Sequence, residues 1–224
     1  MNGGCLKGHR AARNPLYQMW AMFFLRLVPR PLVVQKQGMT NSYNIRTTVA
    51  SDAAAIAEVQ VASWQSSYKG IVPDPLIEQL TIQNRTQAWE RIIPALAENG
   101  QGEVFVWTLD NRIVGFASMG PQRETELRDM GYVAEVTAIY IVDAAKRRGG
   151  GRALMAACAG AAVARGHRQM SVWVLTENWG GRGFYESIGG QELIQRESED
   201  RTAPIDETAY GWTDLQALIA NNPQ

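Results

Sequence analysis

The segment Ala134–Leu154 constrains this chain more than any other stretch. It reads AEVTAIYIVDAAKRRGGGRAL, which is an apolar strand, a basic loop with consecutive glycines, and the start of an Ala-rich helix. This order points the N–H groups of a helix's first turn, and the positive end of its dipole, at one place. The segment therefore predicts a site for a pyrophosphate or another phosphate-bearing ligand.

The loop itself, KRRGGGR, carries both of the features that such a ligand needs. Glycines let the main chain approach a ligand closely and adopt positive φ. Arg147, Arg148 and Arg152 supply charge-assisted donors for phosphate oxygens. A Walker loop is excluded because no Gly-Lys-[Ser/Thr] follows, and a dinucleotide fingerprint is disfavoured because Leu154 stands where a small residue is needed. A solvated surface loop is the alternative interpretation.

Composition narrows the function classes further. The chain has 224 residues, enough for one domain, and its 22 basic and 22 acidic side chains leave no net charge. Neither nucleic acid nor a membrane is therefore an expected partner. Cys5, Cys158, His9 and His167 have no metal-ligand spacing, so no metal is expected. A reducing cytoplasm is the default location.

The first 38 residues form a separate question. Leu16–Val28 contains the apolar run WAMFFL, which Arg26 interrupts and which is too short to span a bilayer. A weak signal anchor is the alternative. We expect residues 1–38 to be an extension, disordered or upstream of a functional start at Met39, and the folded domain to span residues 43–224.

Hydrophobic periodicity and turn residues predict an α/β fold with a mixed sheet. The expected strands are Tyr43–Thr48, Glu103–Thr108, Arg112–Met119, Tyr132–Val142, Met170–Thr176, Glu192–Arg196 and Glu207–Trp212. The expected helices begin after Ser51 and at Thr81, Arg152 and Asn178, and a last one follows a capping box of Thr213 and Gln216. Asp110-Asn111 predicts a hairpin turn, and Pro73 and Pro75 predict a loop.

Three motifs, in order and at proper spacing, resemble the GNAT superfamily of N-acetyltransferases. Lys146-x-x-Gly149-x-Gly151 is similar to its acyl-CoA loop, [Gln/Arg]-x-x-Gly-x-[Gly/Ala]. The later family motif, Asn-x-x-Ala-x-x-Phe-Tyr-Glu, is matched by Asn178, Gly181, Phe184, Tyr185 and Glu186. A lead-in found in one bacterial branch resembles Ser63-Trp64-x-x-x-Tyr68-Lys69-Gly70 with Pro73. The resemblance covers residues 43–212, with departures at Lys146, at Gly181 and at Gly190, where an aromatic residue is common.

The resemblance implies a mixed, mostly antiparallel central sheet flanked by helices and splayed between the fourth and fifth strands. It implies acetyl-CoA as co-substrate, no metal, and direct transfer of an acetyl group to a primary amine in a ternary complex. We expect a small-molecule acceptor. The alternatives are a protein N-terminal or lysine acetyltransferase and a non-catalytic acyl-CoA-binding module. A homodimer is one option for the assembly.

Roles for individual residues follow from the same resemblance. Glu135 is the candidate base, with a structural ion pair as the alternative role and with Glu103 and Glu124 as weaker candidates. Tyr185 is the candidate acid for the CoA thiolate, with core packing as the alternative. Asn178 would bind pantetheine, or cap its helix, or both. The backbone of Ile139 and Ile141 would pair with pantetheine and stabilise the oxyanion, while their side chains belong to the core.

The remaining candidates lie on the two sides of the expected site. The loop would bind the pyrophosphate through Lys146, Arg147, Arg148, Gly149, Gly150, Gly151 and Arg152. Trp64 and Tyr68, at i and i+4, share a helix face on the acceptor side. Core packing is the alternative for that pair.

Overall fold

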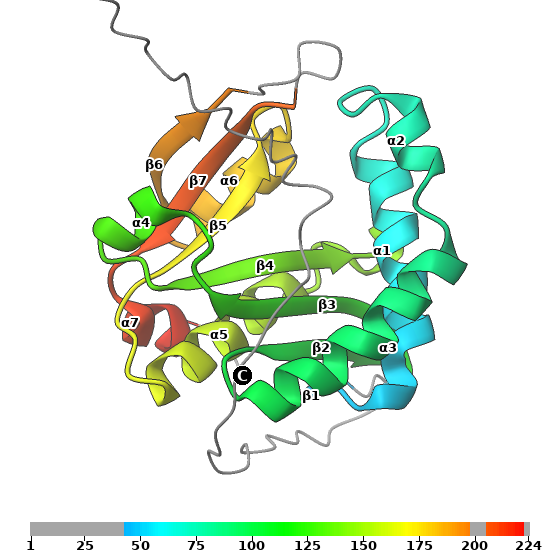
Figure 1. Ribbon diagram of the computed structural model, residues 1–224, viewed down its shortest axis with the longest axis horizontal. Helices are drawn as coiled ribbons and strands as arrows, with labels where there is room; N and C mark the ends of the chain where they lie inside the picture. Colours follow the sequence, from blue (N-terminus) through cyan, green and yellow to red (C-terminus); the bar gives the residue numbers. More distant parts are fainter. Residues whose placement is uncertain (1–42, 198–204, 222–224) are drawn as a thin grey trace, which may run out of the picture.

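One seven-stranded sheet crosses the molecule in the order β1-β2-β3-β4-β5-β7-β6 (Figure 1). The computed structural model describes residues 43–197 and 205–221, so the expected extension 1–38 lies outside the described residues. The strands are β1 (Tyr43–Thr47), β2 (Glu103–Leu109), β3 (Arg112–Pro121), β4 (Ala134–Ile141), β5 (Met170–Leu175), β6 (Gln191–Arg196) and β7 (Glu207–Trp212). Among the described strands of this sheet, β4 and β5 alone pair in parallel. The predicted mixed, mostly antiparallel sheet is therefore confirmed.

Helices cover both faces of this sheet. They are α1 (Ala53–Ser67), α2 (Asp74–Glu78), α3 (Ile82–Asn99), α4 (Thr125–Asp129), α5 (Gly150–Ala164), α6 (Trp179–Ser187) and α7 (Leu215–Ala220). Helices α1 and α3 pack on one face, where Ile56 and Trp89 lie among the residues of one buried cluster. Helices α5 and α7 cover the other face, where Leu154 and Leu218 belong to a larger cluster. The sheet therefore separates two hydrophobic cores.

Strand β4 carries a bulge that decides what its side chains face. Its pairing with β3 shifts register at Thr137, because Ser118 pairs with Ala138 and Met119 pairs with Val136. The Thr137 hydroxyl contacts the Ser118 carbonyl at 3.2 Å. An extra residue in one strand bends it and ends regular pairing. Here the bulge directly follows the last residue of β4 that pairs with β5.

Local signals in the sequence located most element ends. The Thr81 side chain accepts a hydrogen bond from Asn84 N–H and caps α3 as predicted. Asp110 and Asn111 both have positive φ, at 48° and 63°, which is the conformation of a tight hairpin turn. The capping box at Thr213 was wrong: Asp214 is the N-cap of α7, and its carboxylate accepts from Ala217 N–H. Asp214 stands one position nearer the helix than Thr213.

The loop expected around Pro73 and Pro75 also needs correction. Pro75 lies inside the first turn of α2, where a proline is tolerated because its missing N–H has no helical partner there.

Among the described residues, no helix has both the length and the apolar character needed to cross a membrane.

Candidate active site

The sheet opens between β4 and β5. The two strands pair over only three positions, Ala134–Val136 with Met170–Val172, and then diverge (Figure 1). Beyond that point Ile139 and Ile141 still pair with β3, so the edge of β4 that faces β5 has main-chain groups without ladder partners. The side chains of Ile139 and Ile141 pack on the larger hydrophobic core, as expected from the sequence. An extended ligand with amide groups fits such an edge.

The glycine loop leads from β4 into α5 and fixes the start of that helix. Arg147 and Gly149 have left-handed backbones, with φ of 64° and 85°, so the turn needs a glycine at the second position. A Cβ on Gly150 would lie 2.0 Å from Cε3 of Trp107, in β2. The middle glycine therefore serves close packing of α5 on the sheet. The first-turn N–H groups of α5 point out of this rigid junction.

Some of the basic side chains of the loop already have partners within the protein, and others are available to a ligand. Lys146 forms an ion pair with Asp143 at 2.5 Å and donates to Oγ of Ser67, at the end of α1, at 3.2 Å. Arg152 donates to the carbonyl of Ser187 at 3.3 Å. Arg147 and Arg148 are exposed and have no partner within the described part of the chain. These two arginines are the cations most available to a bound anion.

Helix α6 forms the far wall of the opening, and Asn178 begins it. The Asn178 side-chain oxygen accepts from Gly181 N–H at 3.0 Å, so the capping role is present. A Cβ at Gly181 would lie 2.8 Å from Nδ2 of Asn178 and 3.0 Å from Cγ2 of Val174, so an alanine there would need these side chains to shift. A Cβ at Gly190 would lie 2.7 Å from the Trp212 ring. Trp212 thus fills the space of the missing aromatic residue.

Tyr185 lies on α6 and is 5 % exposed. Its ring packs against Phe184, Tyr210 and Trp212, with centroid distances of 5.4, 5.9 and 5.9 Å. Burial raises the pKa of the Tyr185 phenol well above 10.0, and the nearby Tyr140 adds to the effect. The phenol therefore stays protonated at neutral pH, which is the state required of a proton donor.

The carboxylate of Glu135 is fully buried and held by Arg123. The Arg123 side chain forms an ion pair with both oxygens, and Nε donates to Oε2 at 3.0 Å. The Arg123 main-chain N–H adds a further bond at 3.2 Å. The structural ion pair left open by the sequence is therefore present. The catalytic role of Glu135 stays a prediction.

Sequence comparison decides the family. The model of the acetyltransferase (GNAT) family matches residues 61–190. The uncharacterized N-acetyltransferase YuaI of Bacillus subtilis is 31% identical over 177 residues, which is 78% of this chain and 95% of the relative. The chain belongs to the GNAT acetyltransferase family. It is accordingly an N-acetyltransferase.

Solved structures of GNAT proteins share the fold. A complex of PaiA N-acetyltransferase from Thermoplasma acidophilum with coenzyme A superposes with a TM-score of 0.60 at 20% identity, covering 74% of this chain and 98% of the other. YncA of Salmonella typhimurium, a putative acetyltransferase solved with acetyl-CoA, gives 0.56 at 21% identity, covering 76% and 93%. Such distant likeness establishes the fold, while the expected splay between the fourth and fifth strands is seen in the short β4–β5 pairing of this chain.

Trp64 and Tyr68, the pair that the sequence predicts to face the acceptor, meet edge to face at a centroid distance of 5.0 Å. Trp64 is 7 % exposed and packs with Val72, Ile77 and Leu175, so part of its role is core packing. Their contribution to acceptor binding stays a prediction.

Sequence reasoning missed two residues beside this pair, Tyr140 on β4 and Arg85 on α3. Tyr140 packs against Phe116 at 5.5 Å and also contacts the cluster around Trp64. Burial raises the pKa of Tyr140, while the neighbouring Trp64, Tyr68 and Arg85 oppose the rise. The sequence did contain one signal that could have identified Tyr140. It is the only residue with a hydroxyl group in the otherwise apolar run Ala138–Val142.

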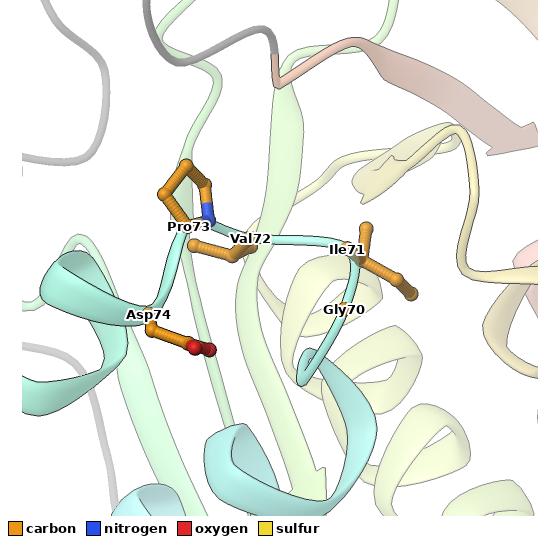
Figure 2. Close-up of a pocket in the computed structure, with 5 residues that line it drawn as sticks. All are labelled: Gly70, Ile71, Val72, Pro73 and Asp74. Atoms are coloured by element: carbon orange, nitrogen blue, oxygen red, sulfur yellow. The ribbon is translucent and has the colours of Figure 1, made fainter.

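An open hollow of about 320 Å³ lies beyond Tyr68, along the loop from α1 to α2. Figure 2 shows the residues that line it, Gly70, Ile71, Val72, Pro73 and Asp74. The main-chain N–H groups of Ile71 and Val72 both donate to the Tyr68 carbonyl, at 3.0 and 2.9 Å. The loop that lines the hollow is therefore hydrogen-bonded to Tyr68, one of the two residues expected on the acceptor side.

Proposed function

We propose that this GNAT enzyme transfers the acetyl group of acetyl-CoA to the primary amine of a small molecule, by direct attack in a ternary complex. The opening between β4 and β5 carries this proposal, because it offers unpaired main-chain groups next to a helix N-terminus. PaiA with coenzyme A and YncA with acetyl-CoA have the same fold, which supports the choice of donor.

The described residues fit the chemistry of the donor along its length. The exposed Arg147 and Arg148 and the first-turn N–H groups from Gly149 onward suit the pyrophosphate. The unpaired edge of β4 at Ile139 and Ile141 suits the two amides of pantetheine. The amide nitrogen of Asn178 is free to donate to a pantetheine carbonyl, since capping uses only the oxygen.

In the transfer step, the neutral amine nitrogen attacks the thioester carbonyl carbon. The C–N bond forms, the C–S bond breaks, and the products are an amide and the CoA thiol. Main-chain N–H donors near Ile139 would stabilise the oxyanion, a contribution of about 3 kcal/mol when preorganised. Tyr185 would donate the proton that the leaving thiolate needs, and it is protonated to do so.

The attacking amine must lose a proton. Deprotonating an alkylamine of pKa about 10.4 costs roughly 4.6 kcal/mol at pH 7. Glu135 is four residues before Ile139 on β4, about 13 Å at the usual rise per residue. A proton that reaches Glu135 therefore passes through water.

The test uses the purified full-length chain with acetyl-CoA and a panel of small amines and peptides, following thiol release. Release with small amines supports the proposal. Release with peptides alone would establish a protein acetyltransferase instead, and acetyl-CoA binding without release would contradict transfer. Gly151→Glu tests the donor site, because a Cβ there lies 3.1 Å from Phe184 and the added charge opposes pyrophosphate. Retained acetyl-CoA affinity in that variant would contradict the loop assignment.

A further inference from the structure

Arg85 differs from most half-buried arginines of the described chain because it has no acid partner. The half-buried Arg46, Arg165, Arg182 and Arg196 each form an ion pair with a carboxylate. Within residues 43–197 and 205–221, half-buried Arg85 and Arg152 lack one. Arg152 lies in the loop proposed to bind pyrophosphate. Arg85 lies on the opposite, acceptor side of β4, on α3.

The guanidinium of Arg85 is held in place by neutral groups only. Its Nε donates to Oε1 of Gln60 at 3.0 Å, and Trp89 Nε1 donates to the same oxygen at 2.9 Å. Its Nη2 is buried without a hydrogen-bond partner among the described residues. Burial lowers the pKa of Arg85, and the nearby Tyr140 opposes the fall. Such an uncompensated buried cation is costly unless a ligand supplies the counter-charge.

Further donors surround the same place. The indole N–H of Trp64 lies beside the Tyr140 hydroxyl and makes no well-formed hydrogen bond, and it is buried. The Ser63 hydroxyl, one turn of α1 after Gln60, is also buried without a partner among the described residues. The Arg85 charge acts on Tyr140 directly. Arg85, Trp64 and Ser63 therefore each offer a buried donor that no described residue uses, which suits a site for an anionic oxygen group.

We propose that Arg85, with Trp64 and Tyr140, binds a carboxylate of the acceptor, so that the substrate is an amino acid or a related amine carrying a carboxylate. This inference rests on the proposed function and names its acceptor class. Tyr140 lies between Ile139 and Ile141 in β4, the residues proposed to position the thioester. A carboxylate held at Tyr140 therefore places a nearby amine at the reacting carbonyl.

The test compares matched acceptors. Common α- and ω-amino acids are assayed beside their primary amides and decarboxylated amines, with phosphoethanolamine as the phosphate arm. We expect wild-type kcat/KM to favour the carboxylate over the amide by about 10- to 100-fold, the usual worth of a charged hydrogen bond. Equal values for acid and amide would overturn the inference, and a preference for phosphoethanolamine would replace the carboxylate with a phosphate.

Variants separate recognition from general damage. Arg85→Gln should lower kcat/KM for the acids much more than for the amides, so that the preference for the acid disappears, and Arg85→Lys should restore part of that preference. Arg91→Gln, on the same helix but exposed and bonded only to the Gln87 carbonyl, is the matched control. An equal loss for acids and amides in Arg85→Gln, with Arg85→Lys no better, would contradict a recognition role.

A binding measurement keeps this inference distinct from the proposed function. Calorimetry of the same acids and amides with wild type and Arg85→Gln needs no turnover. If no amine releases thiol yet acids bind in an Arg85-dependent manner, the transfer proposal fails and the carboxylate site stands. If amides bind and react as well as acids, the transfer proposal stands and the carboxylate site fails.

Discussion

Glu135 and Tyr140 lie on the same face of β4, although an odd number of positions separates them. Ala134 and Val136 face the larger core, and so do Ile139 and Ile141, so the alternation reverses between Val136 and Ile139. The bulge at Thr137 causes the reversal. One face of the strand therefore carries the Glu135–Arg123 ion pair at one end and the Tyr140–Arg85 group at the other.

The ion pair predicts unequal losses of stability. Arg123→Met leaves the fully buried Glu135 carboxylate unpaired, which should cost about 3–5 kcal/mol of unfolding free energy. Glu135→Gln leaves Arg123, whose side chain is 41% exposed and can be hydrated, and should cost less. Urea unfolding of both variants measures the difference, and the reverse order would show that Glu135 does not depend on this pair.

The catalytic role of Glu135 predicts a change in the pH–rate profile. In Glu135→Gln the side chain cannot take the amine proton, so kcat/KM at neutral pH should fall by about 10²- to 10⁴-fold. The rate should then recover as pH rises toward the acceptor's pKa, because the solution supplies neutral amine. A stable Glu135→Gln protein with the wild-type profile would remove Glu135 from the mechanism.

Tyr185→Phe should lower kcat by about 10²-fold or more, with little change in acetyl-CoA affinity. The raised pKa of Tyr185 keeps the phenol protonated as pH increases, so the acid form persists through the range where an ordinary tyrosine, of pKa 10.0, begins to ionise. Wild-type kcat should therefore show no alkaline decline from Tyr185 below about pH 10. An unchanged kcat in Tyr185→Phe would show that the residue only packs.

Asn178 allows its two roles to be separated. Asn178→Ala loses the cap of α6, worth about 1 kcal/mol, and also the amide donor. Asn178→Asp keeps a capping oxygen and replaces the N–H donor with a charged oxygen. We expect a lowered Tm in the first variant alone, and a raised KM for acetyl-CoA in both. A wild-type KM in Asn178→Asp would leave capping as the whole role.

Two glycines of α5 provide opposite predictions for the same substitution. Gly150→Ala forces a Cβ into the Trp107 ring and should cost about 1–3 kcal/mol of unfolding free energy. Gly160→Ala meets no atom within 4 Å and should stabilise the helix by up to about 1 kcal/mol. Thermal unfolding distinguishes the two, and a stable Gly150→Ala protein would contradict the close approach of α5 to β2.

The sequence predicted the order of the strands along the chain because each has a local signal of apolar residues and turn chemistry. The glycine loop and the Asn178 cap were predicted for the same reason. Arg85 and Tyr140 were missed because their proximity depends on non-local events: the packing of α3 on α1, and a bulge that depends on how β3 pairs with β4. Strict alternation would place Tyr140 on the opposite face from Glu135.

The seam of three residue pairs between β4 and β5 has a mechanical consequence. Among the described strands, β1–β4 join β5–β7 within the sheet over these three pairs alone. The two parts of the sheet are also joined by the hydrophobic core beneath it. There Trp107 of β2 and Tyr210 of β7 belong to the same buried cluster as the residues of α5. The width of the gap that would receive an acyl chain is therefore governed by side-chain volume under the sheet, so repacking that layer is the natural way to retune which acyl groups enter.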